Sequence, residues 1–227
     1  MKILVVSDLH MDRNASQAIA LASRKVPFTF CGGDIGARRN DEPEEIMDYM
    51  ARTFKSEHTL VTPGNHDFWP VNIVKLYAGP SRIRVVVDRA VHLYDGDKSL
   101  LVWFSPWSTQ FCEWNWMLDS DEDTYAIPEE VDMIVTHGPA YDICDRCPNG
   151  DNAGSHGLRE AIERTCAKTI FSGHIHGSGF AKRVDDRHNR SWYNTSVLDE
   201  MYWFKGKLPV FDTKTGEMEY WEEKDWQ

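Results

Sequence analysis

The stretch Pro63-Gly64-Asn65-His66-Asp67 follows a short run at residues 59–62 that is rich in apolar and β-branched side chains. Such a run is typical of a strand, and Asn and Asp beside Gly are typical of a tight turn. Amide, imidazole and carboxylate side chains are poor core formers. The chain is therefore predicted to leave a buried strand and to place three polar side chains together on one turn.

Four other apolar runs end in the same way, with histidine or carboxylate side chains directly behind them. Side chains at i and i+2 of an extended segment point to the same face. Asp8 with His10, and His174 with His176, are each expected to converge on one centre, so two pairs could chelate two metal ions. The other two runs end at Asp34 and His137.

The order of strand-like and helix-like segments predicts an α/β fold. Buried strands are expected at residues 2–6, 28–31, 59–62, 132–136 and 169–172. Helical periodicity covers residues 15–25, 43–54 and 158–168. Further strands are expected at residues 83–87, 91–94, 99–104, 180–184, 191–195, 208–211 and 218–221. This order favours two packed sheets with helices outside, and functional residues beyond the carboxyl ends of strands.

Length and composition predict one domain over residues 1–227. A chain of 227 residues with 41% hydrophobic residues can bury one sizeable core. Its longest apolar runs are far shorter than a membrane helix requires, and no secretory signal precedes the first strand, so the cytoplasm is the expected compartment. Five irregularly spaced cysteines, including Cys144 and Cys147 in a loop, indicate free thiols.

The formal net charge of −11 argues against a broad surface for nucleic acid or anionic lipid. An anionic substrate must therefore be attracted locally. The sequence gives no indication of the oligomeric state.

The polar turns form five motifs in a fixed order: D-x-H at Asp8, G-D at Asp34, G-N-H-D at Asn65, H-G at His137 and G-H-x-H at His174. Each motif alone has an ordinary explanation as a turn, a helix cap or a surface histidine. In this order they closely resemble the calcineurin-like metallophosphoesterase family. The segments Ser105-Pro106-Trp107 and Thr136-His137-Gly138-Pro139 are similar to small single-domain members.

The resemblance implies a two-sheet β-sandwich flanked by helices, with a dinuclear metal site at one end. It also implies a hydrolase that cleaves phosphomonoesters or phosphodiesters by direct attack of a metal-bridging hydroxide. His66 would be a catalytic residue beside the phosphate and not a ligand. The implied ligands are Asp8, His10 and His176 for one metal, Asn65, His137 and His174 for the other, and Asp34 as the bridge.

The residue types agree with this chemistry. Two divalent ions bring four positive charges, whereas Asp8 and Asp34 supply two negative charges, so the centre would attract phosphate. Mixed oxygen and nitrogen ligands favour manganese or iron, and zinc is also compatible. His66 could stabilise the phosphoryl oxygens or protonate the leaving oxygen. The rival hypothesis is a non-catalytic metal-binding interaction scaffold of the same fold.

Substrate contacts are open to two interpretations. Arg13, Arg38 and Arg39 could bind a phosphate or carboxylate, or could lie in solvated loops. Aromatic side chains crowd residues 103–116 and could stack on the base of a nucleotide-like substrate, although core packing explains them too. The long segment at 138–157 lacks periodicity and is a candidate substrate loop.

Overall fold

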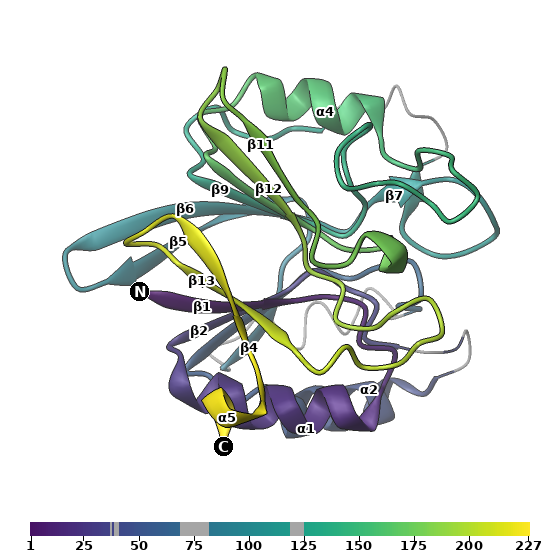
Figure 1. Cartoon of the computed structure of the whole chain (residues 1–227), viewed down its shortest axis with the longest axis vertical. Coiled ribbons are helices and arrows are strands. Elements are labelled where there is room, and N and C mark those ends of the chain that lie inside the picture. Colours follow the sequence, from purple (N-terminus) through teal and green to yellow (C-terminus); the bar gives the residue numbers. More distant parts are fainter. Residues whose placement is uncertain (37, 39–40, 69–81, 119–124) are drawn as a thin grey trace.

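The computed structural model describes residues 1–36, 38, 41–68, 82–118 and 125–227. Two six-stranded sheets lie face to face (Figure 1). The predicted two-sheet architecture with outer helices is confirmed. In the part of the chain that is described, no helix is long and apolar enough to cross a bilayer.

The first sheet contains four parallel strands, β1 to β4, and two antiparallel strands on one side. Its order is β14 (Glu217–Trp221), β13 (Leu208–Asp212), β1 (Lys2–Val6), β2 (Phe28–Cys31), β3 (His58–Val61) and β4 (Ile83–Val85). The β-branched runs that predicted strands thus form the centre of this sheet.

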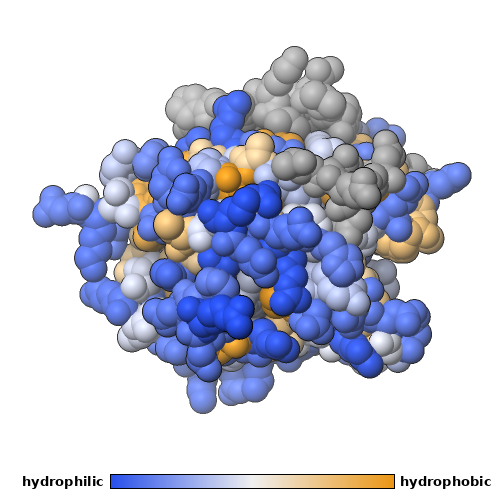
Figure 2. Space-filling model, turned by 90° about the horizontal axis from the view of Figure 1, so that it is seen from above, coloured by the Kyte–Doolittle hydropathy of each residue, from blue (hydrophilic) through white to orange (hydrophobic). Residues whose placement is uncertain are grey.

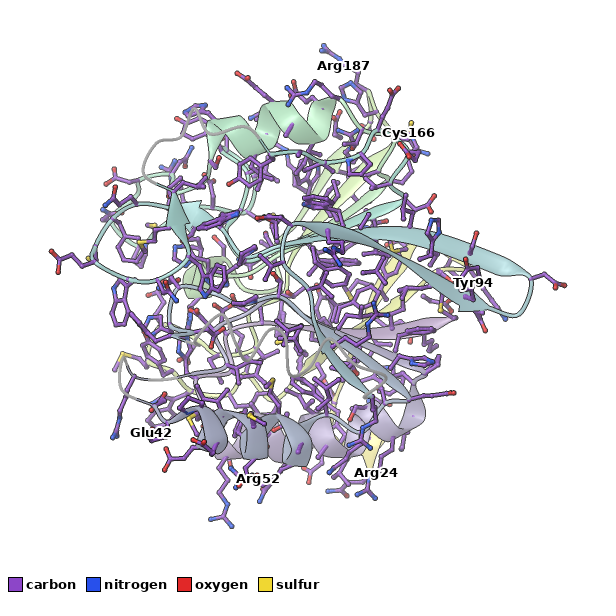
Figure 3. The ribbon with its side chains drawn as sticks, turned by 180° about the vertical axis from the view of Figure 1, so that it is seen from behind. Arg24, Glu42, Arg52, Tyr94, Cys166 and Arg187 are labelled. Atoms are coloured by element: carbon purple, nitrogen blue, oxygen red, sulfur yellow. The ribbon has the colours of Figure 1, made fainter. Side chains whose placement is uncertain are left out.

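The second sheet contains four parallel strands between two antiparallel edge strands. Its order is β11 (Lys182–Asp185), β12 (Arg190–Asn194), β10 (Thr169–Ser172), β9 (Met133–Thr136), β6 (Lys98–Ser105) and β5 (Arg89–Asp95). The hairpin predicted at Asp95-Gly96 joins β5 to β6, and it extends beyond the protein body near Tyr94 (Figure 3).

Helices cover the outer face of each sheet. Helices α1 (Arg13–Ala22), α2 (Pro43–Thr53) and α5 (Glu223–Trp226) lie on the first sheet, whereas α4 (His156–Glu163) lies on the second (Figure 1). Two short 3₁₀ turns, η1 (Ser23–Lys25) and η2 (His176–Ser178), and a two-stranded ribbon of β7 (Ser108–Thr109) and β8 (Met117–Leu118) complete the described elements.

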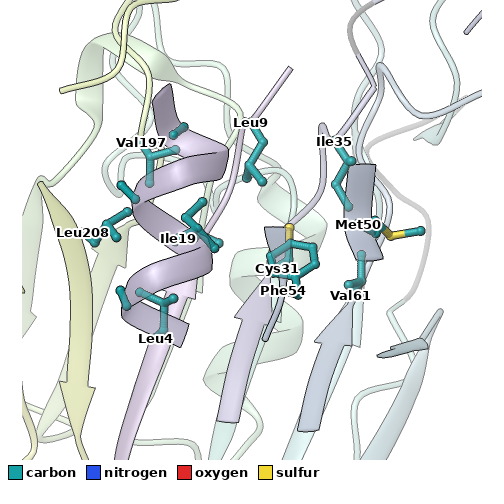
Figure 4. Packing of buried hydrophobic residues seen from close by; sticks show 14 of the residues in the cluster. Leu4, Leu9, Ile19, Cys31, Ile35, Met50, Phe54, Val61, Val197 and Leu208 are labelled. Carbon is teal, nitrogen blue, oxygen red and sulfur yellow. The ribbon is translucent and has the colours of Figure 1, made fainter. Parts of the chain in front are cut away.

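Alternation along the strands divides the core into three layers. In β1, Leu4 and Val6 face α1 and α2, whereas Ile3 and Val5 face the second sheet. Figure 4 shows the outer layer, in which Ile19 of α1 and Phe54, directly after α2, pack over Leu4 and Val61. A third layer lies between α4 and the second sheet. Both sheets are therefore buried on two faces, which accounts for their nearly continuous apolar runs.

Two predicted helices have different boundaries. The helix expected at 15–25 starts at Arg13, because the Asp12 carboxylate accepts from Ala15 N and caps it, and its last turn tightens into η1. The helix expected at 158–168 runs from His156 to Glu163. Its N-terminus is capped by Ser155, and the Thr165 hydroxyl donates to Ile162 O just beyond its end.

The carboxyl ends of the eight parallel strands meet at one end of the sandwich. Ser7, directly after β1, forms a parallel bridge with Ser196, shortly after β12. The loops of both sheets therefore open onto one region, on the right of Figure 1. Figure 2 shows that the face seen from above is mostly hydrophilic, with scattered hydrophobic patches.

Candidate metal centre

The seven predicted metal ligands lie together in the loops that follow β1, β2, β3, β9 and β10. Histidine and carboxylate atoms from these loops form three groups, each with its ligand atoms within 4.8 Å of one another. The groups are Asp8, His10 and His176; Asp34, His137 and His174; and His10, Asp34 and His66. Each of the first two groups combines residues from both sheets.

The first group has two imidazoles facing each other. His10 Nε2 lies 3.2 Å from His176 Nε2, which lies 3.6 Å from Asp8 Oδ1. His176 Nδ1 donates to Asp199 O at 2.9 Å, so its Nε2 presents a lone pair to the group. This is the tautomer required of a metal ligand.

The second group brings two acceptor atoms into contact. His137 Nδ1 donates to Gly32 O at 2.8 Å, which leaves a lone pair on His137 Nε2. That atom lies 2.8 Å from Asn65 Oδ1 and 3.1 Å from His174 Nδ1. Two buried acceptors at such a distance repel each other unless a cation lies beside them. The residues therefore fit a bound metal ion.

Asp34 lies between the two groups. Its Oδ2 is 3.6 Å from His10 Nε2, and its Oδ1 is 3.5 Å from His137 Nε2. With one carboxylate oxygen directed at each group, Asp34 could bridge two cations, as expected from the sequence.

Burial sets the charge state of the site. It lowers the pKa of His10, of His137 and of His174, the last to about 3, so these imidazoles are neutral and carry lone pairs at neutral pH. Burial also raises the pKa of Asp34, and the nearby charge of Asp8 raises it further. Burial acts in the same direction on Asp8, but the hydrogen bond and charge of His176 outweigh it and hold the pKa of Asp8 low. Burial likewise lowers the pKa of His176, but Asp8 outweighs it and raises that pKa, so a proton on His176 Nε2 competes with a metal ion for this lone pair. Divalent cations would compensate these buried carboxylates.

Four residues in the ligand turns have a left-handed backbone conformation that was not predicted from the sequence. Asp8, His10, Asp34 and His174 have φ values of 58°, 43°, 53° and 68°, in the left-handed region. Such conformations cost energy for residues other than glycine and cluster at functional sites. Hydrogen bonds such as Asp8 N to Gly33 O at 2.9 Å and His174 N to Asp8 Oδ1 at 3.0 Å hold them.

These turns correct one expectation from spacing. His174 and His176 do not converge on one centre, because the left-handed turn at His174 and the 3₁₀ turn that begins at His176 send them to different groups. Asp8 and His10 do share a group, although neither residue is extended. The structure groups His10 and His176 with Asp8, and His137 and His174 with Asp34, and the assignment of these residues to two metal ions stays a prediction.

Asp67 holds two turns of the site together. Its Oδ1 accepts from Ile35 N at 3.0 Å and Gly36 N at 2.7 Å, and its Oδ2 accepts from Gly64 N at 2.8 Å. Burial raises the pKa of this carboxyl to about 7, and the backbone donors at Gly36 and Gly64 oppose the rise. The side chain thus fixes the loop of Asp34 against the loop of Asn65.

His66 lies at the edge of the centre. Its ring is 4.7 Å from the ring of His10, in an edge-to-face arrangement, and stacks on Trp114 at 4.1 Å. Its backbone N–H donates to Asp34 Oδ1 at 2.8 Å. The imidazole is therefore held beside the predicted ligands, and its nitrogen is close enough to His10 and Asp34 to form the third group.

Of the arginines predicted to contact substrate, Arg13 and Arg38 do not line the cavity that adjoins His174 and His176. Arg13 lines a separate hollow of about 440 Å³ with Met11, Tyr49 and Arg52, and Arg52 points outward from α2 (Figure 3). Arg38 is exposed, and its backbone N–H donates to Asp41. Arg39 lies outside the described residues. A role for these arginines in substrate binding stays a prediction.

Aromatic packing accounts for part of the tryptophan-rich stretch. Trp107 donates its indole N–H to Asp88 Oδ2 at 2.7 Å and packs against Trp116, whose indole N–H donates to Asp67 O at 2.9 Å. Both rings therefore have structural partners, which favours the packing interpretation for these two.

A cavity of about 580 Å³ adjoins His174 and His176. Residues of the candidate substrate loop line one side, including Cys147 and Asp151, and Phe111 and Tyr202 also line it. Phe111 belongs to the aromatic stretch for which substrate stacking and core packing were both considered, and it is 57% exposed. Tyr202 was not predicted as a site residue, because it carries no motif and its exposed fraction of 50% is visible only in the structure. All five cysteines are free thiols, as expected.

Comparison with known proteins identifies the family that the sequence motifs resemble. The family model for calcineurin-like phosphoesterases matches residues 1–178. The metallophosphoesterase domain-containing protein 1 of Homo sapiens and that of Mus musculus are each 24% identical to this chain over 213 residues, covering 79% of it. The chain spans 64% of the length of these relatives.

Solved structures share the fold at low sequence identity. TT1561 of Thermus thermophilus has a TM-score of 0.63 at 11% identity, covering 97% of this chain and 98% of that one. A novel archaeal phosphodiesterase has a TM-score of 0.56 at 15% identity, covering 97% and 99%. GAP50, described as the anchor in the inner membrane complex of Plasmodium, has a TM-score of 0.59 at 11% identity, covering 100% and 86%.

Proposed function

The chain belongs to the calcineurin-like phosphoesterase family, and we propose that it hydrolyses small phosphomonoesters or phosphodiesters at a centre of two divalent metal ions. The observation that carries this proposal is the contact of two acceptors, Asn65 Oδ1 and His137 Nε2, with Asp34 between that pair and the first histidine group. Family membership supplies the reaction class.

In this proposal each metal ion has its own set of ligands. Asp8, His10 and His176 would hold one ion, Asn65, His137 and His174 would hold the other, and Asp34 would be a ligand of both. The donor set of imidazole, carboxylate and amide favours manganese or iron, with zinc as a further candidate. When bound, such a pair supplies an activated water nucleophile and positive charge for the phosphate oxygens.

The chain's own residues position the substrate and move a proton. His66 lies outside both ligand sets, and its stacking on Trp114 fixes the plane of the imidazole. From there it donates to a phosphoryl oxygen or to the leaving oxygen. Asp67 acts one step further out, because it holds the two turns that carry Asp34 and Asn65.

The substrate and compartment belong to the same proposal. The net charge of −11 supports a small phosphate ester over a long nucleic acid, since only the centre itself would be cationic. Five free thiols fit a reducing compartment, which supports the cytoplasm.

One observation favours a second candidate function. GAP50 has the same fold and is described as an anchor, which makes a non-catalytic interaction scaffold the alternative. An enzyme must hydrolyse a phosphate ester, whereas a scaffold need not.

A single experiment separates them. Metal content is measured by elemental analysis, and the manganese-loaded chain is assayed with p-nitrophenyl phosphate and bis(p-nitrophenyl) phosphate. Hydrolysis of either ester, lost after chelation and restored by metal, supports the enzyme. A metal-loaded chain with no turnover of either ester, or a chain that binds no metal, contradicts it.

A further inference from the structure

The cavity beside the centre has the size of a small-molecule site. Its volume of about 580 Å³ lies within the range of ligand pockets, and its wall includes His174 and His176 themselves. Because these two histidines belong to the centre, the cavity is within reach of the alcohol group of a phosphate ester bound there. The inference below rests on the proposed function and concerns that alcohol group.

Among the described lining residues, the charged side chains are acidic. Asp151 and Glu200 line the cavity, and no lysine or arginine of the described part of the chain does. Two cations outside the lining hydrogen-bond to the chain, and the charge of one of them, Lys205, also interacts with that of Glu200. Lys205 directs its ammonium group at the carbonyls of His176 and Ser196, at 3.1 and 3.0 Å, and Arg146 faces Asn152 from outside the lining.

The carboxylates at the cavity also act on Cys147 in its wall. Burial raises the pKa of the Cys147 thiol, and the charges of Asp145, Asp151 and Glu200 raise it further. Carboxylates from two distant segments of the chain therefore both contribute negative potential at this side of the cavity. A second phosphate or a carboxylate on the alcohol group would be repelled here.

Two aromatic rings lie beside the histidines at this cavity. The ring of Phe111 lies 5.5 Å from that of His174, and the ring of Tyr202 lies 5.0 Å from that of His176. Both rings are half exposed, so their faces are accessible to a ligand. Aromatic faces attract cations, and quaternary ammonium groups in particular.

We propose that the cavity takes the alcohol part of a phosphate ester that carries a cationic ammonium group, such as an amino-alcohol or quaternary-ammonium alcohol. Carboxylates and aromatic faces then bind the ammonium end while the centre binds the phosphate. The ester as a whole is zwitterionic, which suits a protein with an acidic surface and a cationic centre.

The test compares esters of equal shape and different charge. Choline phosphate, its neutral isostere 3,3-dimethylbutyl phosphate, and the phosphate ester of 3-hydroxypropanoate are supplied as monoesters and as methyl diesters. Turnover by the manganese-loaded full chain is followed by phosphorus NMR. We expect kcat/KM for the choline ester to exceed that for the neutral isostere about tenfold, with the carboxylate ester lowest.

Charge-neutral variants identify the source of the preference. Glu200→Gln and Asp151→Asn should each reduce the choline-to-neutral ratio, and the double variant should bring it close to one. Glu57→Gln is the matched control, because Glu57 is exposed and precedes β3 at the opposite end of the sheet. An equal ratio in the unmodified chain, or an unchanged ratio in the double variant, overturns the inference.

A binding measurement keeps this inference separate from the proposed function. If no ester of any kind is hydrolysed, the proposed function fails, and titration calorimetry of choline phosphate against 3,3-dimethylbutyl phosphate still tests the cavity. Tighter binding of choline phosphate that weakens in Glu200→Gln supports the inference. Equal binding of the two esters contradicts it.

Discussion

Asn65 Oδ1 and His137 Nε2 lie 2.8 Å apart, although both atoms are acceptors when His137 Nδ1 donates to Gly32 O. With this amide orientation and a neutral imidazole the two lone pairs face each other, an arrangement that a cation beside them would stabilise. We therefore expect two metal equivalents per chain and a metal-dependent midpoint of thermal unfolding. A ligand at 100 times its dissociation constant stabilises the folded state by about 2.7 kcal/mol. Calorimetry before and after chelation measures the change, and an unchanged midpoint in a metal-free chain contradicts it.

Asp34→Asn and His174→Ala should abolish turnover while leaving the fold largely intact. Removal of a residue that only supports a ligand costs about 10- to 100-fold in activity or metal affinity, so removal of a ligand should cost more. The assay is p-nitrophenyl ester hydrolysis together with far-ultraviolet circular dichroism. Asp97→Asn, in the exposed β5–β6 turn, is the control. Full activity in either site variant would mean that the residue is not a ligand.

His66→Ala should lower kcat by about 10²- to 10⁴-fold, the usual contribution of a general acid or base. Metal content should stay at the value of the unmodified chain, because His66 lies outside both proposed ligand sets. Elemental analysis of the variant decides between the roles. A chain that loses one metal equivalent together with its activity would assign His66 as a ligand.

Asp67→Asn should weaken metal binding and lower stability at the same time. The amide nitrogen of asparagine cannot accept, so one of the three backbone N–H groups bonded to Asp67 would lose its partner. An unsatisfied buried donor costs about 1–3 kcal/mol. Urea unfolding and a manganese titration measure the two effects. A variant with normal metal affinity would show that Asp67 does not position the ligand turns.

Gly64→Ala should disrupt the centre through a steric effect. A Cβ at Gly64 would clash with Asp34 Oδ1 and with the ring of His137. Gly96→Ala is a matched control, because Gly96 has a φ of 61° and open space around it. The control should lose roughly 1 kcal/mol of stability and keep its metal, whereas Gly64→Ala should lose metal binding. Equal metal content in the two variants would contradict the placement of Gly64.

The sequence predicted the strands well because both sheets are buried on two faces. Runs such as Phe28–Cys31 and Met133–Thr136 are buried throughout and mostly apolar, and each polar turn marks a strand end. Short elements without such a signal, including β7, β8 and α5, were not predicted. Their residues become strand or helix through tertiary contacts, as when Ser108 N donates to Trp116 O.

The residues of the centre could be predicted, but the division between its two groups could not be derived from spacing. The i, i+2 rule assumes an extended backbone, and the left-handed turns at Asp8, His10 and His174 break that assumption. The cavity was beyond prediction for a different reason. Phe111, Asp151 and Glu200 come from three distant segments and meet only in the folded chain.

The inner faces of both sheets contribute to a single layer of core, while the loops at one end of that layer share one set of ligands. His176 and Asp8 sit on opposite halves of the sandwich, as do His137 and Asn65. Bound ions would therefore link the two halves of the sandwich. Sliding one half along the other would break the coordination of both ions at once. Amides of β1 and β10, including those at the strand ends away from the ligand loops, should therefore exchange with solvent more slowly in the loaded protein.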